Sequence, residues 1–299
     1  MTSKVGFIGL GSMGLPMAKN LLAKGFTVYG FDVTKAALDA FAKAGGAPKG
    51  SPRDVADLVS VLFLVVATAE QAEDALFGPN GGAALLGEGG VVVLHSTVPP
   101  PFVRELGARL DEMGLALLDA PISGGRAGAE AAALSVMASG SAAAFEAAGP
   151  AFEAMAKTVY RLGDEPGIGS TVKMINQHLA GVHIAAACEA MALGTACGAD
   201  PDTLFEVISN SAGNSWMFTN RVPHILARDF TPLSAVEIFV KDLGIVLETA
   251  KARRFPLPIA AAAHQQYLAA AGSGHGGEDD SAVVKVYERL VGIEVKGKG

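Results

Sequence analysis

The sequence predicts an α/β domain with a doubly wound parallel sheet, followed by an all-helical domain. In the first half, apolar runs without polar alternation are separated by amphipathic stretches, as expected for parallel strands covered by helices on both faces. Beyond the turn cluster at residues 163–167, strand-like runs give way to helical spacing. We therefore expect one domain over residues 1–163 and a second over residues 164–299.

The expected strands of the first domain are short and largely apolar. They cover Val5–Ile8, Phe26–Phe31, Leu58–Val66, Val91–Leu94, Leu115–Asp119, Leu134–Ala138 and Val159–Leu162. The first two expected helices, Pro16–Ala23 and Lys35–Lys43, are each closed by a glycine. Because strands and helices alternate along this half, we expect the strands to form one parallel sheet.

The second domain is expected to begin with one long helix over Thr171–Ala196, about 40 Å in length at the standard helical rise. Within this stretch, residues 179–197 are nearly all apolar and about as long as a membrane span. His183 and Glu189 interrupt the run, so we expect a helix buried in protein and no membrane partner. The shorter expected helices are Pro201–Asn210, Ala235–Arg253, Pro258–Ala270 and Ala282–Val291.

Composition excludes several classes of function. The net charge is −7 and no basic run is present, which argues against a nucleic-acid partner. Cys188 and Cys197 can form neither a disulfide framework nor a metal site by spacing, so no metal is expected. The apolar run near the N-terminus is too short for a signal peptide and breaks into glycines. These features predict a cytoplasmic location.

A glycine-rich turn follows the first expected strand and opens the first expected helix. Its residues, Gly9, Leu10, Gly11, Ser12, Met13 and Gly14, match the pattern G-x-G-x-x-G. The first glycine permits the tight turn, the second lets the backbone approach a pyrophosphate, and the third lets helix pack on strand. Asp32 follows Gly14 by 18 residues, at the end of the second strand. A carboxylate there accepts from ribose hydroxyls and repels a 2′-phosphate, so the cofactor is expected to be NAD.

Two further segments contain groups suited to chemistry, and each has an ordinary alternative. Ser123, Gly124 and Gly125 follow the strand ending at Asp119 and offer a hydroxyl and consecutive N–H groups to a carboxylate; the alternative is a plain glycine loop. Lys173 is one turn from two amides on the long helix, where desolvation would suit it to proton exchange with a hydroxyl; the alternative is a solvated lysine. For Lys241 and Asp242, an exposed ion pair is the default reading.

Taken together, these segments resemble the 3-hydroxyisobutyrate dehydrogenase family of β-hydroxyacid dehydrogenases. The motifs that resemble the family are the glycine turn, Asp119-Ala120-Pro121-Ile122-Ser123-Gly124-Gly125, Gly169-x-x-x-Lys173-x-x-Asn176 and Lys241-Asp242-Leu243. The order of these motifs covers nearly the whole chain. The resemblance implies a Rossmann-like domain, a long interdomain helix and a helical domain, paired as a homodimer or homotetramer.

The resemblance also implies residue roles. Lys173 would be the catalytic acid/base, with Asn176 beside it, and Thr97 and Lys241 would contact the cofactor near the nicotinamide. The residues implied to hold the substrate are Asn176, Gln177, Ser123, Gly124 and Gly125, the last three through its carboxylate. Two positions depart from the family pattern: residues 66–68 read Val-Ala-Thr instead of Met-Leu-Pro, and Ala132 replaces a glycine.

Within the family, the chain is most similar to the L-threonate dehydrogenase branch. The segments that indicate this are residues 176–183, 214–217 and 274–281. They imply a polyhydroxylated four-carbon acid oxidised at C2, with His178, Asn214 and Asp279 as candidates for binding its extra hydroxyls or as simple capping and turn residues. The alternatives are a true 3-hydroxyisobutyrate dehydrogenase, a reductase of tartronate or succinate semialdehyde, and a non-catalytic NAD-binding protein.

Overall fold

The computed structural model describes residues 3–298, so the first two residues of the N-terminal run and Gly299 lie outside the described part. The chain divides into two compact units, residues 1–173 and 174–299. The division falls within the long helix α8 (Ile168–Ala196), between Lys173 and Met174. This helix begins at Ile168, three residues before the expected start, and ends at the expected Ala196.

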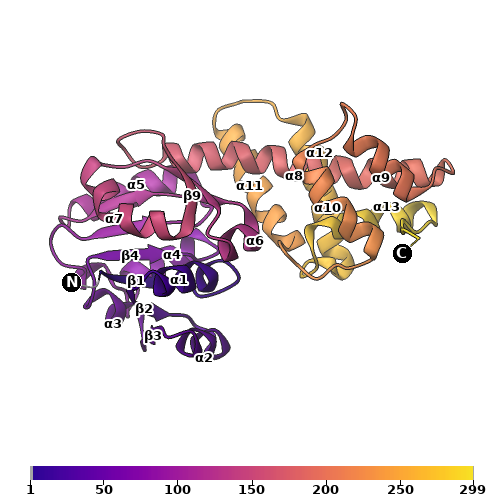
Figure 1. Ribbon diagram of the computed structural model, residues 1–299. Coiled ribbons are helices and arrows are strands. Elements are labelled where there is room, and N and C mark those ends of the chain that lie inside the picture. The colour runs from indigo at the N-terminus through magenta and orange to yellow at the C-terminus, as the bar shows by residue number, and fades with distance from the viewer. Residues whose placement is uncertain (1–2, 299) are drawn as a thin grey trace. The chain divides into compact units, whose positions relative to one another are not determined.

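A six-stranded sheet forms the centre of the first unit, with all neighbouring strands parallel (Figure 1). The strand order is β3-β2-β1-β4-β5-β6. Successive strands are added on one side of β1 up to β3 and on its other side from β4 onward, as in doubly wound nucleotide-binding folds. The strands are β1 (Lys4–Ile8), β2 (Thr27–Phe31), β3 (Ala47–Pro48), β4 (Val61–Leu64), β5 (Val91–Leu94) and β6 (Ala116–Asp119).

Alternate strand residues supply two separate cores, one on each face of this sheet. Phe7, Phe63 and Val93 pack into a core with α1 (Gly14–Ala23) and α7 (Ala142–Met155). Their neighbours along the strands pack into the opposite core with the helices α3 (Pro52–Ala56), α4 (Ala69–Phe77) and α5 (Pro100–Asp111). Burial on both faces explains the continuous apolar runs, since neither face of a strand meets solvent. The remaining helical segments of the unit are α2 (Lys35–Lys43) and the short turn η1 (Ala83–Leu85).

The expectation of one sheet for all strands is wrong for the last two. Strands β8 (Leu134–Ala138) and β9 (Ala156–Arg161) form a separate sheet with the short β7 (Ile122–Ser123), which runs antiparallel to β8. Pro121 lacks an N–H donor, so the ladder of β6 cannot extend past it in the same way. Ser139, the residue after β8, forms an isolated antiparallel bridge with Asp119 at the end of β6. The helix α6 (Gly125–Glu130) separates β7 from β8.

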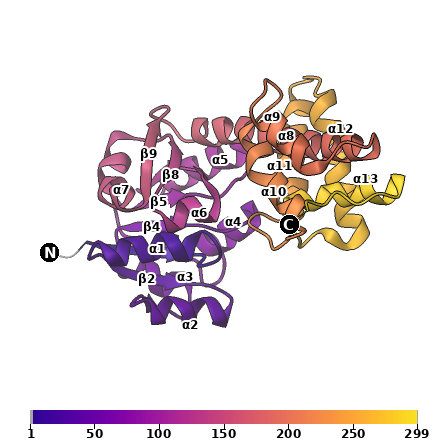
Figure 2. The same ribbon diagram turned by 45° about the vertical axis from the view of Figure 1, so that its right-hand side comes forward.

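Over the described residues 174–298, every named element of the second unit is helical, and Figure 2 shows these helices gathered around the C-terminal part of α8. Ile184, Cys188 and Met191 of α8 share a core with Phe239 and Tyr267. The helices are α9 (Pro201–Ser209), α10 (Trp216–Ala227), α11 (Val236–Ala252), α12 (Pro258–Ala270) and α13 (Val284–Val291), with short helical segments η2 (Ala271–His275) and η3 (Asp280–Val283). Helix α10 was not expected, and it contains Pro223, a residue that usually ends a helix.

Among the described residues, one helix is long and apolar enough to cross a membrane by length and composition, and this helix is α8. Its side buried by the second unit includes Ile184, at 0 % exposure. A core helix of this kind meets the same criterion without a membrane. The expectation of burial in protein is met on that side only, because Ile168, Val172, Ile175, Leu179 and Leu193 are exposed.

Candidate active site

The glycine turn after β1 is required by close backbone approaches. A Cβ on Gly14 would lie 2.0 Å from the carbonyl oxygen of Gly9, and a Cβ on Gly9 would lie 2.3 Å from that of Val65. Gly9 also has a positive φ of 93°, a conformation that favours glycine. A Cβ on Gly11, by contrast, would meet nothing within 4 Å. The space beside Gly11 is therefore available to a bound phosphate.

The first turn of α1 provides further donors toward this space. Met13 precedes the helix and gives it no side-chain cap in the described structure. The N–H groups of an uncapped first turn, together with the positive end of the helix dipole, favour an anion. The turn and the helix start thus fit the pyrophosphate of a dinucleotide.

Asp32 lies at the end of β2 and is connected to the glycine turn. Its Oδ2 accepts from the N–H of Leu10 at 2.7 Å, and its Oδ1 accepts from the N–H of Thr34 at 2.7 Å. Each carboxylate oxygen of Asp32 has a second lone pair, so Asp32 can still accept hydrogen bonds from ribose hydroxyls. Nearby Lys35 is paired with Asp39 at 2.7 Å. This environment fits NAD better than the 2′-phosphate of NADP.

At the ends of the next strands, side chains order the backbone. Ser96 follows β5, and its Oγ accepts from the N–H of Val66 at 3.2 Å. Thr68 caps α4 through a reciprocal pair of hydrogen bonds with Gln71. The Val-Ala-Thr sequence that departs from the family pattern therefore leads into α4 and supplies its N-cap, Thr68. Half-buried Thr97 lies at this carboxyl edge of the sheet, where ligands bind in doubly wound folds.

The loop after β6 contains two consecutive glycines in conformations that other residues rarely adopt. Gly124 has a φ of 127° and Gly125 a φ of 60°. Ser123 pairs with Ser135 in the ladder between β7 and β8 and is half-buried, while both glycines are exposed. Two exposed consecutive glycines with positive φ angles can turn their N–H groups toward an anion, which favours the carboxylate-binding interpretation over a plain connection.

Lys173 is buried at 7 % exposure, so the solvated-lysine alternative is wrong. It lies in the second turn of α8, on the same face as Ser170 and Gln177, which are also buried. Asn176 lies one turn further along and is half-buried. The side chains of Lys173, Asn176 and Gln177 are therefore held on one continuous helix.

A chain of polar contacts in the second unit sets the orientation of the two amides. Gln177 Nε2 donates to Asp242 Oδ2 at 2.6 Å, and Gln177 Oε1 accepts from Asn176 Nδ2 at 3.0 Å. Because an ionised carboxylate only accepts, Asp242 fixes the Gln177 amide, and Gln177 in turn fixes Asn176. Asn176 is thereby left with its Oδ1 as the acceptor on its other side.

The default reading of Lys241 and Asp242 as an exposed pair is wrong. Asp242 is 1 % exposed, and its Oδ1 lies 2.9 Å from the Lys241 ammonium, which is 26 % exposed. Sequence analysis missed this role of Asp242. The signal available was a carboxylate between apolar residues of an amphipathic helix, a position where an acid is rarely found without partners.

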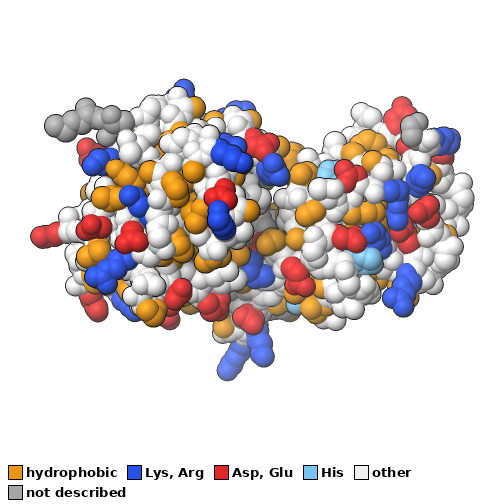
Figure 3. All heavy atoms as spheres, turned by 90° about the horizontal axis from the view of Figure 1, so that it is seen from below, with side chains coloured by type: hydrophobic (Ala, Val, Ile, Leu, Met, Phe, Trp, Pro, Cys, Tyr) orange, Lys and Arg blue, Asp and Glu red, His pale blue; other side chains and the backbone are white. Residues whose placement is uncertain are grey.

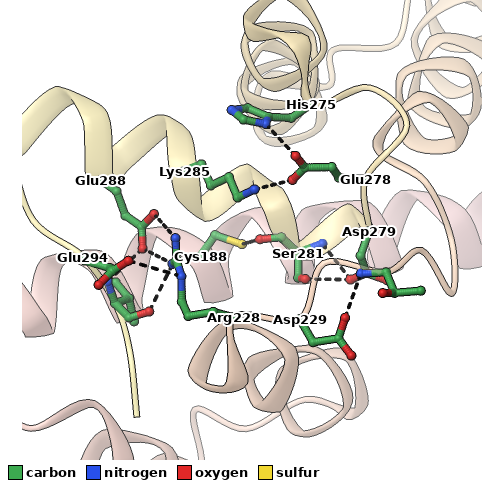
Figure 4. Close-up of polar contacts among 12 residues, drawn as sticks. Cys188, Arg228, Asp229, His275, Glu278, Asp279, Ser281, Lys285, Glu288 and Glu294 are labelled. Atoms are coloured by element: carbon green, nitrogen blue, oxygen red, sulfur yellow. Dashed lines mark hydrogen bonds and ion pairs between the residues drawn. The ribbon is translucent and has the colours of Figure 1, made fainter. Parts of the chain in front are cut away.

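The polar residues of the C-terminal segment serve the fold. Figure 4 shows Asp279 beside Ser281, and the Oδ1 of Asp279 accepts from Ser281 Oγ at 2.6 Å. Asp279 also caps η3, accepts from Leu233 N–H at 3.0 Å and is fully buried. Glu278 forms ion pairs with Lys285 and His275 in the same view.

Asn214 also forms its hydrogen bonds locally, with Thr219 Oγ1 and the carbonyl of Ser209. Of the two alternatives for Asp279 and Asn214, these contacts favour capping.

No cluster of three or more His, Cys, Asp or Glu residues suited to a metal is present among residues 3–298. On the face shown in Figure 3, acidic and basic side chains are interspersed. The groups described at the site are a lysine, amides, carboxylates and backbone N–H donors.

A parallel sheet of this order, with a glycine turn that leaves room for phosphate and an acid after β2, defines an NAD-binding dehydrogenase fold. Residues 4–163 match a family model described as the NAD binding domain of 6-phosphogluconate dehydrogenase. Residues 167–287 match one described as the NAD-binding of NADP-dependent 3-hydroxyisobutyrate dehydrogenase. The chain belongs to the 3-hydroxyisobutyrate dehydrogenase family, and it is an NAD-dependent oxidoreductase of small hydroxy acids.

Relatives and solved structures agree with this assignment over the full length. The chain is 54 % identical to L-threonate dehydrogenase of Cupriavidus necator, covering 100 % of this chain and 99 % of the relative. It is 47 % identical to L-threonate dehydrogenase of Pectobacterium atrosepticum, covering 98 % and 96 %. A crystal structure described as 3-hydroxyisobutyrate dehydrogenase from Salmonella typhimurium superposes with a TM-score of 0.89 at 46 % identity, covering 95 % of this chain and 99 % of that one.

Proposed function

We propose that this enzyme oxidises L-threonate at C2 to 2-oxo-tetronate with NAD. The observation that supports the substrate is the 54 % identity, over the whole chain, to a protein named L-threonate dehydrogenase. A 2-hydroxy acid of this kind offers a carboxylate and an adjacent hydroxyl. The exposed glycine loop after β6 and the buried lysine of α8 are groups suited to recognising these two features.

In this proposal Lys173 removes the proton of the C2 hydroxyl. Bound NAD supplies the acceptor for the hydride that leaves C2. The neutral Lys173 amine takes the hydroxyl proton as the C2 oxygen becomes a carbonyl oxygen, and the resulting ammonium returns the proton in the reverse direction. Burial favours this exchange, because a desolvated ammonium loses its proton more readily than a solvated one.

The other residues bind and orient. The substrate carboxylate would be held by Ser123 and by the N–H groups of Gly124 and Gly125, and Gln177 would take part in substrate binding. Asn176, which is oriented through Gln177 and Asp242, would accept a hydrogen bond through Oδ1 from the substrate hydroxyl or from the Lys173 ammonium. Correct placement of the hydroxyl is itself a large part of the rate.

The cofactor would be held by the residues already described. The glycine turn, residues 9–14, would hold the pyrophosphate, and Asp32 would accept from the ribose hydroxyls. Thr97 and Lys241 would contact the nicotinamide end. Lys241 is directed by its contact with buried Asp242, so its ammonium has a defined position.

A substrate screen tests the proposal. Purified enzyme is mixed with NAD and with L-threonate, D-erythronate, glycerate or 3-hydroxyisobutyrate, and NADH formation is followed by absorbance. We expect kcat/KM to be highest for L-threonate. A higher kcat/KM for 3-hydroxyisobutyrate would overturn the assignment of L-threonate as substrate and favour the activity named for the Salmonella structure. Lack of hydride transfer with every acid, despite NAD binding, would favour a non-catalytic NAD-binding protein.

We also infer that the chain works in the cytoplasm as a homodimer or homotetramer. Both cysteines, Cys188 and Cys197, are unpaired, which suits a reducing compartment. The exposed residues Ile168, Val172, Ile175 and Leu179 recur at alternating intervals of four and three along α8. They form one apolar stripe, which a second copy of the chain can cover.

A further inference from the structure

A buried carboxylate lies between the loop after β6 and the first turn of α8. Asp119 is the last residue of β6 and is fully buried. Its Oδ2 accepts from the N–H of Gly167 at 2.9 Å and from that of Ser170 at 2.8 Å, and its Oδ1 accepts from Ser170 Oγ at 2.6 Å. Asp119 thus caps a helix that begins about fifty positions later in the chain.

Ser139 completes the attachment of this helix start. Its Oγ accepts from the N–H of Gly169 at 3.0 Å and lies 3.4 Å from Asp119 Oδ2. A Cβ on Gly169 would lie 2.4 Å from the carbonyl oxygen of Met137 and 2.8 Å from that of Asp119. The first turn of α8 is therefore pressed against the ends of β6 and β8, and only glycine fits at the contact.

The same segment is attached on its other side to β5. The carbonyl of Ala120, the residue after Asp119, accepts from His95 Nδ1. His95 is buried between Phe63 and Phe152, and burial lowers its pKa to about 4, so the ring is neutral. A neutral ring that donates from Nδ1 holds the backbone at Ala120, three residues before Ser123. The start of the substrate loop and the start of α8 are thus held at one point.

Electrostatics makes this point sensitive to substitution. Burial raises the pKa of Asp119, and the hydrogen bonds from Ser170, Gly167 and Ser139 oppose the increase. The carboxylate also lies at the positive end of the α8 dipole. An asparagine keeps one acceptor oxygen for the N–H groups of Gly167 and Ser170, but it loses the negative charge at the helix start and replaces the oxygen that accepts from Ser170 Oγ by an NH₂ group. Asp119→Asn would therefore weaken the attachment of the helix start to β6.

We propose that Asp119 is a positioning residue for the dehydrogenase reaction, which fixes the first turn of α8 against the substrate loop and so sets the position of Lys173. The proposal rests on the proposed role of Lys173 as proton acceptor. Ser170, which donates to Asp119, lies one turn before Lys173 on the same face of α8. A shift of this turn moves the lysine amine relative to the Ser123 loop, and the reaction is sensitive to small displacements.

The test is a kinetic comparison of Asp119→Asn, Ser170→Ala, Lys173→Ala and the double variant Asp119→Asn with Lys173→Ala. We expect kcat to fall about ten- to a hundredfold in Asp119→Asn and less in Ser170→Ala. The KM for NAD and the NADH dissociation constant should stay within about twofold of the wild type, since the glycine turn and Asp32 are untouched. Ser141→Ala, which removes the cap of α7 in the same unit, is the control for a lost cap alone.

The double variant separates positioning from general damage. If Asp119 acts through Lys173, Asp119→Asn should lower the residual rate of Lys173→Ala by less than about twofold. An additive loss, or equal losses of kcat in Ser170→Ala and Ser141→Ala, would overturn the proposal. Ser170→Ala keeps the test decisive if Asp119→Asn does not fold. Wild-type turnover in Lys173→Ala would instead refute the proposed function, whereas wild-type turnover in Asp119→Asn and Ser170→Ala alone would refute only the role of Asp119.

Discussion

At the scale of single residues, the candidate site contains charged side chains that are removed from solvent. Lys173, Asp119 and Asp242 are all nearly inaccessible, whereas pairs such as Lys35 with Asp39 are exposed. Removing a charge from water is costly unless the charge has partners, so a buried charge reflects a specific structural or chemical requirement. Asp119 and Asp242 hold their neighbours by hydrogen bonds, and the proposal assigns proton transfer to Lys173.

Lys173→Ala tests that assignment. The variant removes the amine while leaving the glycine turn and Asp32 in place, so NADH binding should be unchanged. Turnover with L-threonate should fall about 10²- to 10⁴-fold, the usual contribution of a positioned acid/base. Steady-state kinetics and NADH fluorescence titration measure the two quantities. Lys251→Ala, on the exposed side of α11, is the control. Near-normal turnover in Lys173→Ala would remove lysine from the mechanism.

Asp32→Ala tests the choice of cofactor. Loss of the carboxylate removes the acceptor for the ribose hydroxyls and the repulsion of a 2′-phosphate. We expect the KM for NAD to rise about ten- to a hundredfold, equivalent to one or two charged hydrogen bonds, and the preference over NADP to narrow. Glu73→Ala, which breaks only an exposed pair between α4 and α5, should change neither value. A wild-type preference for NADP would contradict the role given to Asp32.

Elements of regular length were predictable because local pattern determines them. The sequence predicts α2, β5, β8 and α12 with the observed bounds, since each segment is a local apolar pattern with a glycine one or two residues beyond one of its ends. The division of the strands into two sheets was not predictable from such patterns. It depends on pairing between β7, which has two residues, and β8. Sequence spacing also gives no sign that Asp119 meets Ser170 or that Gln177 meets Asp242, because these contacts join distant segments.

Ala132 shows how a departure from the family pattern affects an element. The N–H of Ala133 donates to the carbonyl of Gly128 and that of Ala132 to Ala129, which is the Schellman ending of α6. Ala132 therefore takes a positive φ of 53°, where glycine is usual. Ala132→Gly should relieve this strain and raise the free energy of unfolding by about 0.5–1 kcal/mol, after the entropy of glycine in the unfolded chain is subtracted. Urea unfolding measures the change.

The matched control for this prediction is Ala131→Gly, one residue earlier. Ala131 has a φ of −84°, which alanine adopts without strain. Glycine there should lower stability by up to about 1 kcal/mol, because only the entropy cost remains. If both substitutions changed the free energy of unfolding in the same direction, backbone strain at Ala132 would not determine the result.

A buried ion pair connects α10 to η3 in the second unit. Arg221 Nε donates to Asp280 Oδ1 at 2.6 Å, and both side chains are nearly inaccessible. Asp280→Ala leaves the guanidinium buried without this partner, so the free energy of unfolding should fall by about 3–5 kcal/mol. Asp39→Ala, at an exposed pair, should cost less than about 1 kcal/mol. Urea unfolding monitored by Trp216 fluorescence compares them. A smaller loss of unfolding free energy in Asp280→Ala than in Asp39→Ala would contradict a structural role for the Arg221–Asp280 pair.

For the whole molecule, the remaining prediction concerns association through α8. Leu179 is 51 % exposed and belongs to the apolar stripe with Ile168, Val172 and Ile175. If a second copy covers this stripe, Leu179→Asp places a charge in the interface and should shift the protein toward monomer. Light scattering after size exclusion measures the mass at several concentrations. Ile259→Asp, at a residue 67 % exposed on α12, is the control for an added charge on apolar surface. An unchanged mass for Leu179→Asp, or an equal shift in both variants, would place the interface elsewhere.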